Sequence, residues 1–284
     1  MRIAFLTLRD RGNFVIDDEL AIAVLRARGC EVDEIPWQND ADWKSYDSVM
    51  VRSTWDYQQA AEAFLAVLER IAAVTTLWNP IDVIRWNIRK TYLRDLAAKG
   101  VPIVPTTFGS GATFRDLMRT SGRAVLKPVV SANAYDTFVL GDPKRTAPLA
   151  EIESKFENRE WLFQPFVSSV ETEGEHSLFY FANQYSHAVL KQPKSGDFRV
   201  QEEHGGIITP EQPAADVRRV ADAVIAAMGR PLAQARVDLI RLDDGTPALM
   251  ELELIEPSLY FRTDPRAPDS FADALLSLQS KARA

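Results

Sequence analysis

Residues 234–254 read QARVDLIRLDDGTPALMELEL, and this stretch predicts a hairpin of two long strands. Apolar and charged side chains alternate on both sides of Asp244-Gly245, a pair that favours a tight turn between strands. If Asp244 and Gly245 are the two central turn residues, the expected pairs are Asp243 with Thr246, Asp238 with Glu251, and Arg236 with Glu253. A four-residue loop gives the same pairs, whereas a three-residue turn would shift the register and separate Asp238 from Glu251.

The expected pairing gathers acidic side chains on one face of the hairpin. Directly opposed residues share a face, so Asp238, Glu251 and Glu253 project together, flanked by Arg236. The opposite face carries Met250, Leu252 and Leu254. Three carboxylates within cross-strand reach repel one another unless a cation lies between them, and oxygen ligands without nearby histidine or cysteine favour magnesium. A solvated strand face that keeps the charges apart explains the pattern equally well.

The composition argues against a nucleic-acid or membrane protein. The chain has 284 residues, enough for two lobes or for a compact three-layer enzyme. Its formal charge of -7 argues against a nucleic-acid surface, because neutralising phosphates requires a basic excess. No apolar stretch approaches the roughly 20 residues that cross a bilayer. The single cysteine, Cys30, excludes an internal disulfide, and Arg2 leads into a strand-like run rather than a signal peptide. We therefore expect a cytoplasmic protein.

The N-terminal region predicts a parallel sheet with helices on its faces. Residues 2–8, 32–35 and 48–51 are strand-like, and 17–28 form an amphipathic helix that ends at Gly29. The third strand runs into the polar-aromatic segment RSTWDY at 52–57. Open α/β sheets hold ligands at the carboxyl ends of their strands, so we expect this segment to form a pocket wall.

The rest of the chain predicts connecting helices and two further lobes. Asn79-Pro80 suits the N-cap and first turn of a helical region through Leu96, which ends at Gly100, and Pro102 and Pro105 mark a linker. Residues 124–128 and 160–164 resemble strands of a small antiparallel lobe, and longer strands follow from 177 onward. We expect a mixed α/β and α+β fold: an N-terminal α/β domain at 1–78, connecting helices at 79–105, a small central lobe at 106–165 and a larger C-terminal lobe at 166–284.

Basic residues in three segments are candidates for binding phosphate. Lys127 lies in an apolar run, where its ammonium needs an anion unless it reaches solvent from an edge strand. Lys90 lies off the apolar face of its helix, which by itself predicts a solvated lysine. The third group contains Lys191, Arg199 and His204-Gly205-Gly206, whose glycines would bring backbone N–H groups close to an anion. A polar surface loop is the alternative for this group.

Taken in order, these segments resemble the ATP-grasp superfamily of carboxylate–amine ligases over about the last two-thirds of the chain. The resemblance implies that Lys90 and Lys127 contact the phosphates of ATP. It implies an interlobe hinge at 164–167, where Gln164 leads into Phe166 and Val167, whose backbone holds the adenine edge. It also implies a carboxylate for the ribose: Glu175, with Glu171 as the rival.

The resemblance further implies a metal site and groups for the chemistry. Asp238, Glu251 and Glu253 match positions that bind Mg2+, with Mn2+ as a substitute, although many relatives have asparagine in place of Glu253. Lys191 and Arg199 are similar to the basic residues that approach the γ-phosphate and the acyl phosphate, assisted by Arg236. The expected substrate contacts are Arg52, Ser53, His204, Gly205 and Gly206. Two departures are the glycine-poor loop at 129–136 and Ser177, where the glutathione-synthetase-like branch often has arginine.

Within the superfamily, the segments WNP at 78–80, VETEGE at 170–175 and ELELIEPS at 251–258 look closest to small bacterial enzymes of the cycloserine-synthetase type. Such enzymes close an O-ureido-serine-like amino acid into a ring. We therefore expect an ADP-forming ligase of antibiotic biosynthesis that activates a small amino-acid-like carboxylate as an acyl phosphate for attack by nitrogen. An intermolecular amino-acid ligase and a non-catalytic nucleotide-binding module are the alternatives. The resemblance leaves a monomer and a homodimer open.

Overall fold

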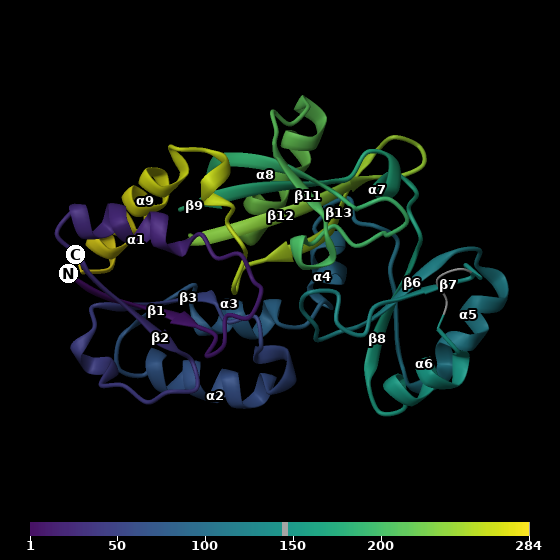
Figure 1. Ribbon diagram of the computed structural model, residues 1–284, viewed down its shortest axis with the longest axis horizontal. Helices are drawn as coiled ribbons and strands as arrows, with labels where there is room; N and C mark the ends of the chain where they lie inside the picture. Colours follow the sequence, from purple (N-terminus) through teal and green to yellow (C-terminus); the bar gives the residue numbers. More distant parts are fainter. Residues whose placement is uncertain (144–146, 284) are drawn as a thin grey trace.

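The computed structural model describes residues 1–143 and 147–283, and three sheets organise them (Figure 1). One sheet lies in the N-terminal part, a second in a small lobe at the far end of the molecule, and the third above them in the C-terminal part. Within the two described ranges, no helix is both long and apolar enough to cross a membrane.

The N-terminal layer is the predicted parallel sheet. Its strand order is β2-β1-β3-β4, and all three pairings are parallel. Residues 3–6 of β1 are completely buried, as expected for a strand covered on both faces. The elements are β1 (Arg2–Thr7), α1 (Asp18–Ala27), β2 (Glu31–Pro36), β3 (Ser48–Ser53), α2 (Ala61–Ala72) and β4 (Thr76–Trp78).

Two short helices connect this layer to the rest of the chain: α3 (Ile81–Asn87) and α4 (Tyr92–Ala98). The prediction that Asn79 caps the first of them is wrong, because Pro80 occupies the N-cap position. The Asn79 amide instead donates to the carbonyl oxygens of Gln234 and Leu254, at 2.8 Å each. Leaving those buried carbonyl oxygens without donors would cost more free energy than Asn79 would gain by capping the helix, so its side chain bonds to them.

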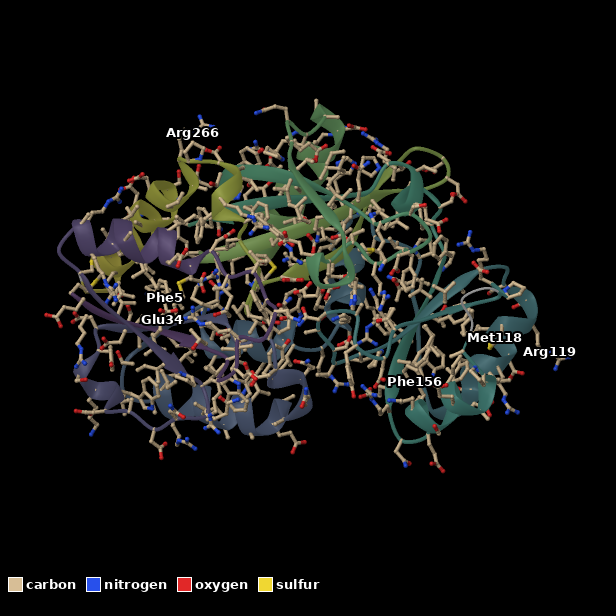
Figure 2. The ribbon with its side chains drawn as sticks, in the orientation of Figure 1. Phe5, Glu34, Met118, Arg119, Phe156 and Arg266 are labelled. Carbon is tan, nitrogen blue, oxygen red and sulfur yellow. The ribbon has the colours of Figure 1, made fainter. Side chains whose placement is uncertain are left out.

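The small lobe has an antiparallel sheet of order β5-β8-β6-β7, with α5 and α6 packed on it. Phe114 of α5 packs against Phe156 of α6 and against Trp161 of the sheet. Figure 2 shows Phe156 inside this lobe and Arg119 at its outer end. The elements are β5 (Thr107–Ser110), α5 (Phe114–Thr120), β6 (Ala124–Pro128), β7 (Phe138–Leu140), α6 (Leu149–Phe156) and β8 (Glu160–Pro165).

The C-terminal lobe has a five-stranded antiparallel sheet of order β11-β10-β9-β12-β13. Its two faces follow the alternation of β9: Leu178 and Tyr180 pack toward α8, whereas Phe179 and Phe181 pack toward α9 and the N-terminal layer. The elements are α7 (Ser169–Thr172), β9 (Glu175–Phe181), β10 (Gln184–Gln192), β11 (Ile207–Pro210), α8 (Ala215–Met228), β12 (Gln234–Arg241), β13 (Pro247–Glu253) and α9 (Ala267–Arg283).

The hairpin of β12 and β13 has the predicted pairs of Asp238 with Glu251 and Arg236 with Glu253, but the predicted pair of Asp243 with Thr246, and with it the predicted turn, is wrong. Leu242 N–H donates to Thr246 O at 2.9 Å, which leaves three residues, 243–245, in the turn. Such a turn alone would separate Asp238 from Glu251. A β-bulge restores the alignment, because the register shifts between Asp238, which pairs with Glu251, and Leu239, which pairs with Leu249. Met250 is the extra residue, and Arg236 pairs with Glu253 as predicted.

The sheets follow the order of the four predicted ranges, whose boundaries at 79, 106 and 166 stay predictions. Residues 144–146 and 284, inside the third and fourth ranges, lie outside the described part of the chain.

Candidate active site

A cavity of about 180 Å³ lies where the three sheets meet. The N-terminal layer contributes Trp55 and Tyr57 from the segment after β3. Lys90 comes from the connection between α3 and α4, Lys127 from β6, and Glu251 from β13. These residues come from segments that are far apart in the sequence, from Trp55 to Glu251.

The hairpin supplies a buried charge network. Arg236 and Glu253 line the cavity and form an ion pair. Asp238 lies behind them, outside the cavity lining and 2% exposed. Arg236 Nη2 donates to Asp238 Oδ2 at 2.9 Å, and the hydroxyl of Ser177 also donates to this carboxylate. Burial alone would raise the pKa of Asp238, but Arg236 and Lys191 outweigh burial and hold it at about 2.

Two other carboxylates of the site, Glu251 and Glu175, are also paired with cations. Lys90 Nζ lies 2.8 Å from Glu251 Oε1, and Lys191 contacts Glu175. Burial alone would raise the pKa of Glu251, but the nearby lysines lower it, Lys90 first and then Lys127. Burial raises the pKa of Glu253 to about 7 despite the contact with Arg236. Within the described residues, no three acidic, histidine or cysteine side chains converge as a preformed metal site.

Lys90 and Lys127 are both buried. The alternative that either lysine reaches solvent is therefore wrong. They are 6% and 8% exposed, and both line the cavity. Lys90 also donates to the carbonyl oxygen of Ser131 at 2.6 Å. Burial lowers the pKa of Lys127, opposed by the charge of Glu251. A phosphate group arriving in the cavity would relieve this desolvation.

One wall of the cavity is apolar, as an aromatic base requires. Val104 and Ile240 belong to it, and Met250 joins them. The prediction that Met250 faces away from the carboxylates is wrong. The bulge places Met250 and Glu251 opposite a single partner residue, which breaks the alternation of sides.

The predicted hinge, at the end of β8, also borders the cavity. Gln164, Phe166 and Val167 line it. The Gln164 amide donates to Thr106 Oγ1 at 3.0 Å, and Phe166 N–H donates to Arg123 O at 2.9 Å. The N–H of Phe166 is therefore engaged within the protein.

The two ribose candidates are separated. Glu175 lines the cavity, is 3% exposed, and burial raises its pKa. Glu171 lies outside the lining and faces Arg123 at 3.5 Å.

The loop between β10 and β11 reaches the cavity with only part of the predicted set. Arg199 lines it and pairs with Asp197 at 2.8 Å, but His204, Gly205 and Gly206 do not line it. A side chain on Gly206 would place its Cβ 2.0 Å from the carbonyl oxygen of Val200. The glycine at 206 is therefore explained by close packing within the loop.

Arg52 and Ser53 lie on β3 but do not line the cavity. Arg52 is 2% exposed, contacts Asp18 at 2.7 Å and also contacts Gln234. This side chain ties the N-terminal layer to the start of β12. The pocket wall predicted from the RSTWDY segment is formed by its aromatic residues, Trp55 and Tyr57.

Sequence reasoning missed several cavity residues with polar groups, among them Asn87 and Glu256. Asn87 Nδ2 donates to Leu252 O at 2.8 Å, and Leu254 N–H donates to Asn87 Oδ1 at 2.9 Å. Glu256 lines the cavity together with Tyr57. The position of Glu256 directly after the hairpin, in the segment ELELIEPS, is the sequence feature that could have identified it as a cavity residue.

Sequence comparison relates the chain to known biosynthetic proteins. A family model described as the N-terminal domain of D-cycloserine synthetase DcsG matches residues 3–79. The cycloserine biosynthesis protein DcsG of Streptomyces lavendulae is 34% identical over 272 residues, covering 88% of this chain and 89% of that protein. The chain belongs to the cycloserine-synthetase family of ATP-grasp proteins. As such it is an ATP-dependent ligase.

Solved structures agree with this family. The crystal structure of D-cycloserine synthetase DcsG superposes with a TM-score of 0.86 at 29% identity, covering 98% of this chain and all of that one. A D-alanine–D-alanine ligase from Bacillus anthracis complexed with ATP has a TM-score of 0.67 at 15% identity, covering 100% and 98% of the two chains. The second likeness shows the ATP-grasp fold alone. The mixed fold with a small central lobe and a larger C-terminal lobe is thus confirmed.

Proposed function

We propose that this ligase activates the carboxylate of a small amino acid as an acyl phosphate and closes it onto a nitrogen of the same molecule. The observation that carries the proposal is the cavity in which Lys90, Lys127 and Glu251 meet between the lobes. Buried ammonium groups beside a carboxylate suit a polyphosphate accompanied by a cation.

The chain's own residues account for the first step. Lys90, Lys127, Lys191 and Arg199 offset the negative charge on the phosphates while the substrate carboxylate attacks the γ-phosphorus in line. The bond from the γ-phosphorus to the bridging oxygen breaks, and ADP leaves. In the second step the substrate nitrogen attacks the acyl carbon, and inorganic phosphate leaves. No protein side chain becomes covalently modified.

The hairpin carboxylates suit Mg2+, with Mn2+ as a substitute, because magnesium prefers a few carboxylates together with substrate phosphate oxygens. Glu251 and Glu253, which line the cavity, would hold the ion with Asp238 directly behind them, and the ion would neutralise charge on the β- and γ-phosphates. The lysine and arginine partners that now pair with these carboxylates would then be free to bind the phosphates.

The opposite end of the cavity suits the nucleoside. Val104, Ile240 and Met250 offer apolar contact to adenine. The backbone after Gln164 offers polar contact through the carbonyl oxygen of Phe166, whose N–H already donates to Arg123 O, and through Val167. Glu175 is favoured over Glu171 for the ribose, because Glu175 lines the cavity. For Arg52, Ser53, His204, Gly205 and Gly206 the structure offers no support as substrate contacts, since none of them lines the cavity.

The substrate is proposed from the family, whose named members make cycloserine. An O-ureido-serine-like amino acid contains both the carboxylate and the nitrogen, so turnover would need no second amino acid. We also propose that the enzyme works in the cytoplasm, where ATP is available, as a monomer or a homodimer.

The test is phosphate release from ATP against a panel of amino acids, with and without added amines. The proposal expects ADP and phosphate with O-ureido-serine alone. A requirement for a second amino acid would favour an intermolecular ligase instead. Tight ATP binding without phosphate release across the panel would favour a regulatory module, and formation of AMP and pyrophosphate would contradict the acyl phosphate route.

A further inference from the structure

We infer that Glu256 binds the α-ammonium group of the amino-acid substrate, with the Tyr57 hydroxyl holding its carboxylate in place. This inference rests on the proposed function and specifies how the site would recognise an amino acid. It assigns a binding role to a residue in the segment that follows β13 and leads away from the metal-binding hairpin.

The first observation is that Glu256 is a buried carboxylate without a cation. It is 7% exposed and lines the cavity. The other buried acids in the described residues each have a basic partner: Asp18 pairs with Arg52, and Glu175 and Asp238 pair with Lys191. Among these residues, no lysine, arginine or histidine forms an ion pair with Glu256. A buried carboxylate without such a partner is costly unless a ligand supplies the charge.

The second observation is that the backbone at Glu256 is fixed in position. The Trp55 indole N–H donates to the backbone oxygen of Glu256 at 2.8 Å, and Tyr57 lines the cavity together with Glu256. Tyr57 is 4% exposed and stacks on Phe64 at 4.8 Å between ring centroids. A single hydrogen bond from the Tyr57 hydroxyl would leave the remaining lone pairs of the carboxylate available to a ligand in the cavity.

The third observation is the place of Glu256 within the cavity. The charges of Glu253, Lys90 and Glu251 act on the carboxylate of Glu256. These three residues lie at the end of the cavity where the γ-phosphate of ATP would bind. Burial, followed by the charge of Glu253, raises the pKa of Glu256 to about 8, and the charge of Lys90 offsets only part of this rise. In an α-amino acid, the ammonium and the reacting carboxylate are attached to the same carbon. A substrate carboxylate beside the phosphate would therefore have its ammonium close by, where Glu256 lies.

The experiment compares O-ureido-serine with 3-(ureidooxy)propanoic acid, the same molecule without its α-amino group. We expect the wild-type chain to have a KM roughly 10- to 100-fold lower for the amino acid, the range of one charge-assisted hydrogen bond. In Glu256→Gln, the KM for the amino acid should rise to that of the analogue, so that the ratio of the two approaches 1. Glu62→Gln, on the exposed face of α2, is the matched control and should keep the wild-type ratio.

Three outcomes would overturn the inference. One is a wild-type chain that does not discriminate between the two compounds, a result that needs no variant. Another is a Glu256→Gln chain that keeps the wild-type ratio of the two KM values. The third is a Glu256→Gln chain whose KM rises equally for both compounds, as a purely structural role of Glu256 predicts. If Glu256→Gln does not fold, Tyr57→Phe tests the support, and a loss of discrimination of several-fold is expected.

Failure of the proposed function has a different signature. It would appear as a wild-type chain that releases no phosphate with either compound. Calorimetric titration of both compounds into the wild-type and Glu256→Gln chains, with ADP and Mg2+ present, would then still decide the role of Glu256. Equal affinities in the two chains would overturn it.

Discussion

At the scale of single residues, replacing Lys127 should affect the reaction rate and the stability of the fold differently. Its ammonium is buried, and burial lowers its pKa. Lys127→Met should reduce the rate of phosphate release by about 100-fold or more, the usual effect of removing one charge-stabilising group. The free energy of unfolding should not fall, because the substitution removes the cost of burying a charge. Steady-state kinetics and urea unfolding measure the two effects, and a large loss of stability would contradict this account.

The two acids at the centre of the hairpin are expected to differ in the same measurements. Glu251 lines the cavity, whereas Asp238 lies behind it between Arg236 and Lys191. Asp238→Asn would leave two buried cations undercompensated and should cost about 3–5 kcal/mol of stability. Glu251→Gln should abolish metal-dependent turnover with a smaller loss of stability. Parallel urea unfolding curves distinguish the variants, and equal losses would show that the two acids act alike.

His187 should make the protein less stable in mild acid. Its ring stacks on Phe179 at 4.3 Å between centroids, and burial lowers its pKa to about 4. As the pH falls from about 6.5, the unfolded chain takes up a proton before the folded chain does, so this contribution to stability declines until about pH 4. The full loss is about 3 kcal/mol. Urea unfolding between pH 7 and pH 4 measures it.

The control for this prediction is a pair of matched variants. His187→Gln should be less sensitive to pH over that interval, whereas His204→Gln, in the loop between β10 and β11, should keep the wild-type dependence. A wild-type slope in His187→Gln would assign the acid sensitivity to the carboxylates instead.

At the scale of elements, β13 is held in place by side chains from the connecting helices. It is an edge strand, and Asn87 satisfies the backbone of Leu252 and Leu254, while Leu252 N–H donates to the Tyr92 hydroxyl at 2.9 Å. This pairing covers the free edge and fixes the strand that carries Glu251 and Glu253.

Asn87→Ala should therefore destabilise the edge of the sheet. It leaves two buried backbone groups without partners, and each costs about 1–3 kcal/mol. Hydrogen exchange should show faster exchange of the Leu254 amide, and phosphate release should slow as the carboxylates lose their alignment. Asn133→Ala, in the loop after β6, is a control that should leave the Leu254 amide protected. An unchanged Leu254 amide in Asn87→Ala would contradict the role given to Asn87.

The hairpin also shows how far sequence reasoning reaches. Alternation and the Asp-Gly pair predicted the strands and the Asp238–Glu251 pairing, and the structure confirms both. The turn length and the bulge at Met250 were not predictable, because they compensate for each other and neither changes the pairing of the acidic positions. The loop at 129–136 is similar: Asn133 and Ala134 take positive φ values of 53° and 54°, which composition alone does not reveal.

At the scale of the whole molecule, the order of the three sheets was predictable, but contacts between distant segments were not. Arg52 lies at the carboxyl end of a strand, as a substrate contact would, yet Asp18 and Gln234 engage it. Glu256 follows the hairpin without a local pattern, and its role depends on Tyr57, which is about 200 residues away in sequence. Local periodicity defines elements, whereas packing between lobes decides which polar groups face the cavity.

The small lobe should close over the nucleotide while the N-terminal layer stays unchanged. Lys127 on β6 and Gln164 on β8 line the cavity, whereas most of the small lobe projects away from the other sheets (Figure 1). With ADP and Mg2+ at 100 times their dissociation constant, stability should rise by about 2.7 kcal/mol. Hydrogen exchange should show protection concentrated in β6 and β8, because contacts to phosphate and adenine link this lobe to the C-terminal sheet. Equally strong protection in β1 and β2 would instead mean that the nucleotide stabilises the whole chain at once. In either case, chelation of the metal should remove most of the gain in stability.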